Sequence, residues 1–200
     1  EGEAAVRHLM DVDTVHHQTE HPEWVGGPYF EWSQNHHFAN TDETELSGPH
    51  TSHTWLGSLL DYYFLTGDTR AREVARMCAD YCRRAAPYAW KEQLTRRVAA
   101  SALDGDVDWP FSTRRVGWAL TGMGTWYEAF PEERFLPAIE ALVDLLEAWQ
   151  DGDGRWRDQI GTHNRGATPF MIAGVLQGLQ LYHAATGEAR ARRMALAGAA

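Results

Sequence analysis

A helical hairpin with a very short turn recurs three times along this chain of 200 residues. Residues 62–72 (YYFLTGDTRAR) match residues 182–192 (YHAATGEARAR) at an offset of 120, and residues 61–70 match residues 125–134 at an offset of 64. At each place an apolar segment with helical periodicity stands on both sides of the turn. A single match of this turn could arise by chance. Three matches in register predict a fold of repeated helical hairpins.

The residues at the turns predict how the hairpins close. Gly67 can adopt the left-handed conformation that ends a helix, and Asp68 can cap the helix that follows. Ser52 or Thr54 can cap the first helix, and Pro131 suits the first turn of the helix after the middle turn. We expect the first helix of each hairpin, called the inner helix, at 53–65, 113–129 and 169–185. The second helix of each hairpin, called the outer helix, is expected at 68–86, 132–150 and from 188 onward. A partial helix is expected within 1–12 and a short helix at 91–103.

The first inner helix carries an apolar stripe that should face the core. With 44% hydrophobic residues, the chain can bury a sizeable core, and one globular unit is the simplest expectation. We divide this single domain into a histidine-rich loop region, 1–52, and three hairpins, 53–200. No run of 18 apolar residues occurs, so no membrane partner is expected. The stripe consists of Trp55, Leu56, Leu59, Leu60, Tyr63 and Phe64.

Two kinds of connection alternate along the chain. The turns at 66–68, 130–132 and 186–188 are tight, whereas the linkers at 13–52, 104–112 and 151–168 are long and hold most of the His and Asn residues. In a ring of antiparallel hairpins every second connection lies on the same side. We therefore expect all linkers at one end of the hairpins, called the linker end, and all tight turns at the other, called the turn end. The functional site should be at the linker end, where the inner helices start.

The sequence resembles the (α/α) toroid domains of carbohydrate-active enzymes. The resemblance rests on residues 50–68 (HTSHTWLGSLLDYYFLTGD), on 11–17 (DVDTVHH) and on Gly26-Gly27. It is nearest to the C-terminal toroid of exo-acting rhamnogalacturonan-lyase-like proteins. Asn35-His36-His37 is loosely similar to the Asn-His pair of toroid alginate and heparin lyases. Such a toroid contains about twice as many hairpins and is accompanied by β-domains. The resemblance thus implies an incomplete ring and, as partners, the remainder of the toroid or accessory β-domains.

The resemblance implies a polysaccharide lyase that acts on uronic acids. β-Elimination needs a group that neutralises the carboxylate, a base for the C5 proton and an acid for the leaving oxygen. His and Tyr suit the proton transfers, Asn and Arg suit the carboxylate, and Trp offers a face to a sugar ring. The candidate catalytic residues are His36, His53, His17 and Tyr29. The candidate substrate-binding residues are Asn35, His37, Arg114, Arg115, His163, Arg165, Trp24, Trp32 and Trp109.

Charge argues against nucleic-acid binding, and the residue types leave two alternatives to a lyase open. Net charge is −10, with ten acids and one Arg in residues 1–53, so nucleic acid is not an expected partner. A glycoside hydrolase is the first alternative, and its carboxylate pair could come from the five acids named below. A non-catalytic glycan-binding helical module is the second. The acids are Asp13, Glu20, Glu23, Glu31 and Asp61.

No cofactor is expected, although a divalent metal is a rival use for the histidine-rich loop. His17 and His21 are four residues apart, but no His-Glu-x-x-His or Cys-x-x-Cys motif occurs. Cys78 and Cys82 share one helix face and are expected to be buried free thiols. The segment 151–154 (DGDG) lacks the later bidentate Glu of a calcium loop and is expected to be a turn.

Overall fold

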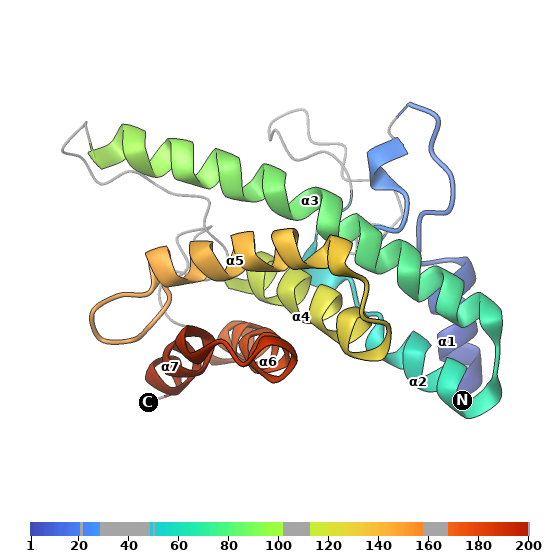
Figure 1. The fold of residues 1–200 in the computed structure, drawn as a ribbon. Helices are drawn as coiled ribbons and strands as arrows, with labels where there is room; N and C mark the ends of the chain where they lie inside the picture. Colours follow the sequence, from blue (N-terminus) through green and yellow to red (C-terminus); the bar gives the residue numbers. More distant parts are fainter. Residues whose placement is uncertain (21, 29–48, 50, 102–112, 158–167, 200) are drawn as a thin grey trace.

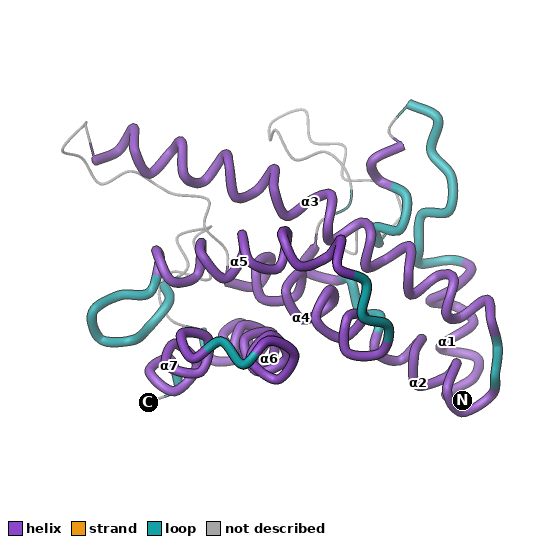
Figure 2. Tube along the Cα trace, in the orientation of Figure 1, coloured by secondary structure: helices purple, strands orange, loops and turns teal. Residues whose placement is uncertain are grey.

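The computed structural model describes residues 1–20, 22–28, 49, 51–101, 113–157 and 168–199, with side chains described for all of these except 53 and 86–101. In this part of the chain the regular structure is helical (Figure 2), with seven α-helices and three short 3-10 helices. The β-type pairing found there is an isolated bridge between Thr14 and Pro28. The prediction of an all-α fold is confirmed.

The helices follow the expected hairpin order (Figure 1). The three hairpins are α2 with α3, α4 with α5, and α6 with α7, and we keep the labels inner and outer for the helices at the expected inner and outer positions. The bounds are α1 Gly2–Asp11, η1 Pro22–Trp24, η2 Thr51–His53, α2 Gly57–Thr66, α3 Thr69–Ser101, α4 Thr113–Ala129, η3 Glu133–Phe135, α5 Leu136–Trp149, α6 Pro169–Thr186 and α7 Ala189–Gly198.

The first and third tight turns are built from the same hydrogen bonds. Gly67 and Gly187 have left-handed φ values of 76° and 75°, and each donates its N–H to the carbonyl four residues earlier. The hydroxyls of Thr66 and Thr186 donate to the carbonyl four residues earlier, at 2.6 and 2.7 Å, and accept the N–H two residues later at 3.2 Å. The Asp68 carboxylate accepts the N–H of residue 70 at 2.9 Å. The predicted Gly67 turn and Asp68 cap are confirmed.

The inner helices α4 and α6 run parallel. Gly117, near the start of α4, lies against Val175, and Gly124, two turns later, lies against Leu181. The residue numbers rise together along both helices, so their starts lie at the same end of the pair. The spacing between contacting residues, 57 or 58, agrees closely with the offset of 56 that separates the second and third sequence repeats.

The inner helix α2 has the same direction as α4. Leu56, just before α2, lies near Gly122, and the rings of Tyr63 and Phe130, at the far ends of the two helices, have centroids 6.1 Å apart. These pairs are separated by 66 and 67 residues, close to the repeat offset of 64. The starts of α2, α4 and α6 therefore share one orientation, as the hairpin argument expected.

The outer helices complete the core, and α1 adds a further layer beside α2 (Figure 1). α3 packs against α4 and α5, and Phe135 of η3, which follows the middle turn, is fully buried. On α1, Met10 is buried, and Asp11 accepts two hydrogen bonds from the Arg70 guanidinium at 2.8 and 3.1 Å. Among the described residues, no helix is long and apolar enough to cross a membrane.

Several local predictions are wrong. The helices expected at 68–86 and 91–103 form one helix, α3, although Pro87 lacks the N–H that a helix interior uses. α2 begins at Gly57 after Leu56, so neither Ser52 nor Thr54 caps it.

Two stripe residues and one turn proline also differ from expectation. Trp55 and Phe64 are 49% and 62% exposed, whereas Leu56, Leu59 and Leu60 are buried as predicted. Pro131 precedes η3 and does not belong to the first turn of α5.

Candidate functional site

The linker end is held together by a hydrogen bond between two hairpins. The Thr51 hydroxyl, in η2, donates to the backbone carbonyl of Arg115 in the first turn of α4 at 2.8 Å. Ser52 and Thr113 are buried on either side of this contact, while Arg114 and Arg115 are half-buried. The segment that carries His53 therefore lies beside the two arginines that open α4.

Tyr81 fixes the chain just before this contact. Its hydroxyl, on α3, donates to the backbone carbonyl of Pro49. Burial raises the pKa of the Tyr81 phenol, and the Cys82 thiol beside it acts in the same direction, with a smaller opposing effect of Arg115. The phenol therefore stays protonated and serves as a fixed donor, which ties residue 49 to α3 rather than acting as a base.

Two tryptophans form an aromatic pair at the linker end. The ring centroids of Trp55 and Trp118 are 6.1 Å apart, with ring planes inclined at 67°. Trp118 is half-buried against Gly174 of α6, and a Cβ at Gly174 would lie 3.6 Å from its indole ring. Trp55 is 49% exposed, so one large ring of the pair remains accessible from solvent. Such a ring is suited to stacking on a sugar.

Sequence reasoning missed this pair for a definable reason. The sequence places Trp55 in a core stripe because its spacing fits a helix that begins at residue 53, whereas α2 begins at Gly57. The repeats could have indicated this pair. Trp55 and Trp118 are 63 residues apart, close to the offset of 64 between the first two repeats, so they stand at nearly equivalent positions of neighbouring hairpins. A further exposed aromatic residue, Phe170, lies one turn before Gly174 on α6 and is 58% exposed.

The loop 12–28, which carries the predicted residues His17 and Trp24, contacts α3 through Val25 and Gly26. Gly26, with φ of 88°, packs directly on the backbone of Met77 and Cys78, and the Arg84 guanidinium donates to the Val25 carbonyl. His17 is exposed and its Nε2 lies 3.2 Å from the Thr19 hydroxyl, while Trp24 is half-buried in η1. Val25 and Gly26 of this loop thus contact the outer helix α3.

The other predicted site residues fall on parts of the chain outside the description. For His53 only the backbone is described, in η2. The residues outside the described ranges are Tyr29, Trp32, Asn35, His36, His37, Trp109, His163 and Arg165.

The buried cysteines are not suited to nucleophilic chemistry. Both are free and buried on one face of α3, and burial raises the pKa of the Cys78 thiol to about 12. Burial also raises the pKa of Cys82, and the neighbouring Cys78 adds to this effect. A thiol must ionise to act as a nucleophile or metal ligand, so both are structural groups at neutral pH. Across the described residues no group of three or more His, Cys, Asp or Glu side chains could hold a metal ion.

The segment 151–154 forms a turn, as predicted. Gly154 has φ of 84° and its N–H donates to the Asp151 carbonyl at 2.8 Å. Arg157 pairs with the carboxylate of Asp151 and with that of Asp153, so both acids already have a partner within the protein. Trp156 is fully buried, and its indole N–H donates to the Leu146 carbonyl at 2.8 Å.

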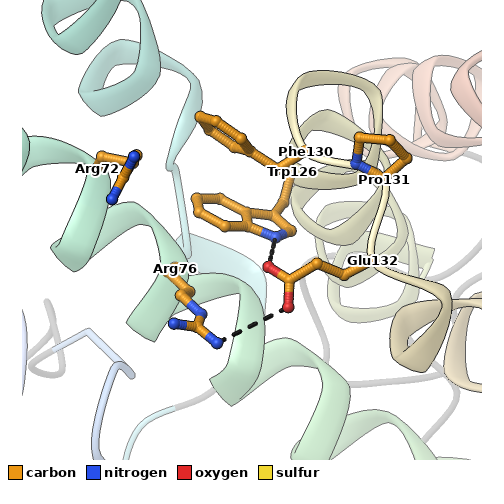
Figure 3. Close-up of a pocket in the computed structure, with 6 residues that line it drawn as sticks. All are labelled: Arg72, Arg76, Trp126, Phe130, Pro131 and Glu132. Atoms are coloured by element: carbon orange, nitrogen blue, oxygen red, sulfur yellow. Dashed lines mark hydrogen bonds and ion pairs between the residues drawn. The ribbon is translucent and has the colours of Figure 1, made fainter.

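A pocket of about 410 Å³ lies at the opposite, turn end of the hairpins (Figure 3). It is formed where the first turns of α3 face the end of α4. The functional site was expected at the linker end, so this pocket was not predicted. Comparison with family models, with curated proteins and with solved structures finds no match to this chain.

Proposed function

We propose that this chain is part of an (α/α) toroid that cleaves a uronic-acid-containing polysaccharide by β-elimination at its linker end. The proposal is supported first by the parallel inner helices α2, α4 and α6, which is the arrangement that a toroid requires of its inner ring. Further hairpins or accessory β-domains would then be the partners that complete the enzyme.

The hydrogen bond from Thr51 to the Arg115 carbonyl is the observation that carries the proposal. It joins the segment bearing His53 to the helix turn bearing Arg114 and Arg115. A lyase needs an imidazole and a cationic carboxylate-binding group close together. The two segments are about 60 positions apart in the sequence, and this hydrogen bond joins them.

The proposed reaction assigns one role to each kind of residue. Arg114, with Asn35 as a second donor, hydrogen bonds the uronate carboxylate, which makes the C5 proton more acidic. His53 or His36 removes that proton, the electron pair forms the C4–C5 double bond, and the C4–O bond breaks. Tyr29 or a second imidazole protonates the departing oxygen. The planar Arg fork suits the first role because it binds both carboxylate oxygens.

The exposed indole of Trp55 gives the proposed site a sugar-binding surface. Its contact with Trp118 fixes the orientation of the ring, which lowers the entropic cost of stacking on a sugar. A non-catalytic glycan-binding module would use the same surface, so the assay has to separate binding from turnover.

Incubation of the chain with polygalacturonate and with rhamnogalacturonan tests the proposal. β-Elimination creates an unsaturated uronate that absorbs in the ultraviolet, together with a new reducing end. New reducing ends without that absorbance would instead show a hydrolase, and retention on the polysaccharide without either product would show a binding module.

Paired variants identify the residues involved. His53→Ala should lower turnover by roughly 10²–10⁴-fold, the usual contribution of a general base, with unchanged helical circular dichroism. His183→Ala is the matched control, because His183 lies near the end of α6 at the turn end, where its Nδ1 contacts the Glu188 carbonyl at 3.1 Å. Equal losses in the two variants, or none in His53→Ala, would contradict the assignment.

A further inference from the structure

The pocket at the turn end combines an aromatic wall with arginines from one face of α3 (Figure 3). Its volume of about 410 Å³ falls within the range of small-molecule sites, which is about 300–1,000 Å³. Trp126, 2% exposed, forms its base. The lining residues are Arg72, Arg76, Trp126, Phe130, Pro131 and Glu132.

The carboxylate of Glu132 already accepts hydrogen bonds from other residues of the protein. Its Oε1 accepts the indole N–H of Trp126 at 3.0 Å, and its Oε2 accepts the Nε–H of Arg134 at 2.8 Å. The guanidinium of Arg76 lies farther away, at 3.8 Å from Oε2. The one carboxylate in the pocket lining is thus held by Trp126 and Arg134, and it neutralises Arg76 only in part.

Arg72 is held by aromatic rings instead of by an acid. Its guanidinium carbon lies 5.6 Å from the centroid of the Tyr63 ring and 5.9 Å from that of Phe130. In the part of the chain that the structure describes, Arg72 forms no ion pair. A guanidinium stacked in this way is oriented through its faces and keeps its N–H edge for a planar anion.

Guanidinium groups outnumber carboxylates in the ion-paired cluster beside the pocket. Among the described residues, ion pairs link Arg76, Arg83 and Arg134 to the carboxylates of Asp80 and Glu132. This cluster has one guanidinium in excess, and Arg72 is a further cation of the pocket lining. The charged residues that line the pocket are thus two arginines and one carboxylate, which favours an anionic ligand over a neutral one.

We propose that this pocket binds a carboxylate carried on a six-membered ring. The Arg72 fork, aided by Arg76, binds the two carboxylate oxygens, while Phe130 and Pro131 contact the face of the ring. A uronosyl residue and an aromatic carboxylic acid share this chemistry. The proposal stands on the pocket alone and does not rest on the proposed lyase. If the ligand is a uronosyl residue, the pocket is a second binding site for polysaccharide at the opposite end of the hairpins.

Isothermal titration of the 200-residue chain with digalacturonate, with benzoate and with neutral galactose tests this proposal. Binding of either carboxylate, with no binding of galactose, is the expected result. Digalacturonate alone would identify a uronosyl ligand, benzoate alone an aromatic acid, and both the shared chemistry. Absence of binding for both acids, or equal binding of galactose, would overturn the proposal.

Variants locate the binding to this pocket. Arg72→Ala should weaken binding of the carboxylate by about tenfold or more, since it removes a charge-assisted pair of hydrogen bonds. Arg72→Lys retains the charge and should still weaken binding, because an ammonium lacks the planar fork. Arg193→Ala, which removes an exposed arginine of α7, is the control and should leave the affinity unchanged.

Two further outcomes would overturn the proposal. The first is that Arg72→Ala and Arg72→Lys bind the carboxylate as tightly as the wild type. The second is that Arg193→Ala lowers the affinity as much as Arg72→Ala does. Arg114→Ala separates the two proposals: it should reduce turnover at the linker end and leave binding of benzoate at the turn end unchanged.

Discussion

Thr121 on α4 donates its hydroxyl hydrogen to the backbone carbonyl of Gly174 on α6 at 2.8 Å, in a contact buried between the two parallel helices. The helices approach this closely because glycines line their interface. A Cβ placed on Gly117 would lie 2.6 Å from the backbone nitrogen of Val175, and one on Gly178 would lie 2.7 Å from the Leu120 side chain. This interface fixes where the α6 start lies relative to α4, and so it fixes the linker end.

Substitution of Gly117 should separate α4 from α6. Gly117→Ala places a methyl group against backbone atoms, which cannot rotate away, and should destabilise the fold by about 1–3 kcal/mol. Gly57→Ala is the matched control, because a Cβ there meets nothing within 4 Å and alanine favours the helix by about 0.5–1 kcal/mol. Urea unfolding followed by circular dichroism measures both. Equal stabilities of the two variants would contradict the close approach.

The interhelical hydrogen bond should contribute measurably to the same interface. Thr121→Val removes the donor and should cost about 1 kcal/mol in unfolding free energy, whereas Thr121→Ser retains the hydroxyl and should recover part of that loss. The two variants differ in side-chain volume, so their stabilities are compared with the wild type in the same urea titration. A serine variant less stable than the valine variant would show that packing, and not the hydrogen bond, determines the effect.

Trp156 should be among the most sensitive positions of the C-terminal hairpin. It is fully buried, donates to the Leu146 carbonyl and contacts Gly198, where a Cβ would lie 2.2 Å from its ring. Trp156→Ala should cost about 3–5 kcal/mol, as expected for a large cavity. Leu65→Ala, at a side chain 85% exposed, should change the stability by less than about 0.5 kcal/mol. Thermal unfolding checks both, and a mild effect at Trp156 would contradict its core position.

The hairpins could be predicted from sequence because their signals are local. The left-handed turn at Gly67 and the cap at Asp68 depend on a few neighbouring residues, and the repeat spacing then places each hairpin beside the next. Whether Trp55 is buried or exposed depends on where α2 starts, and that start depends on the packing of η2 against α4. The predicted helix starts at residue 53 and α2 at Gly57, and this four-residue difference moves an aromatic ring from a predicted core stripe to the surface.

Tertiary features of the site could not be read from the chain. Nothing in the spacing of Arg72 and Phe130 indicates that the tight turn between α4 and η3 brings them together. The continuity of α3 through Pro87 is equally hidden, because the local cost of a helical proline predicts a break. The roles predicted for His36, His37 and His163 remain predictions, since these residues lie outside the described ranges.

Alkaline pH should destabilise the fold through the buried thiols. Burial raises the pKa of Cys78 from 9.0 to about 12 and also raises that of Cys82. Below pH 9 the thiols are protonated in both states and cost nothing. Above pH 9 the unfolded chain releases protons that the folded chain retains, so stability falls as pH rises toward about 12, by about 1.4 kcal/mol per pH unit for each thiol.

The double variant Cys78→Ala/Cys82→Ala isolates this effect. It should flatten the fall in unfolding free energy between pH 9 and pH 10, while the buried Tyr81 phenol, with its raised pKa, still produces a decline above pH 10. Urea unfolding at several pH values compares the double variant with the wild type. Parallel pH profiles in the two proteins would contradict burial of the thiols.

Trp55 should matter for the sugar and little for the fold. Because the ring is 49% exposed and lies beside Trp118 at the linker end, Trp55→Ala should raise the KM for polygalacturonate by about threefold to tenfold through loss of stacking, with kcat and melting temperature nearly unchanged. Leu65→Ala is the counterpart at the turn end of the same hairpin, where the side chain is 85% exposed, and it should leave the KM unaltered. Steady-state kinetics of the two variants measure the difference. A KM that rises with Leu65→Ala and stays constant with Trp55→Ala would move the sugar-binding surface to the other end of the hairpins.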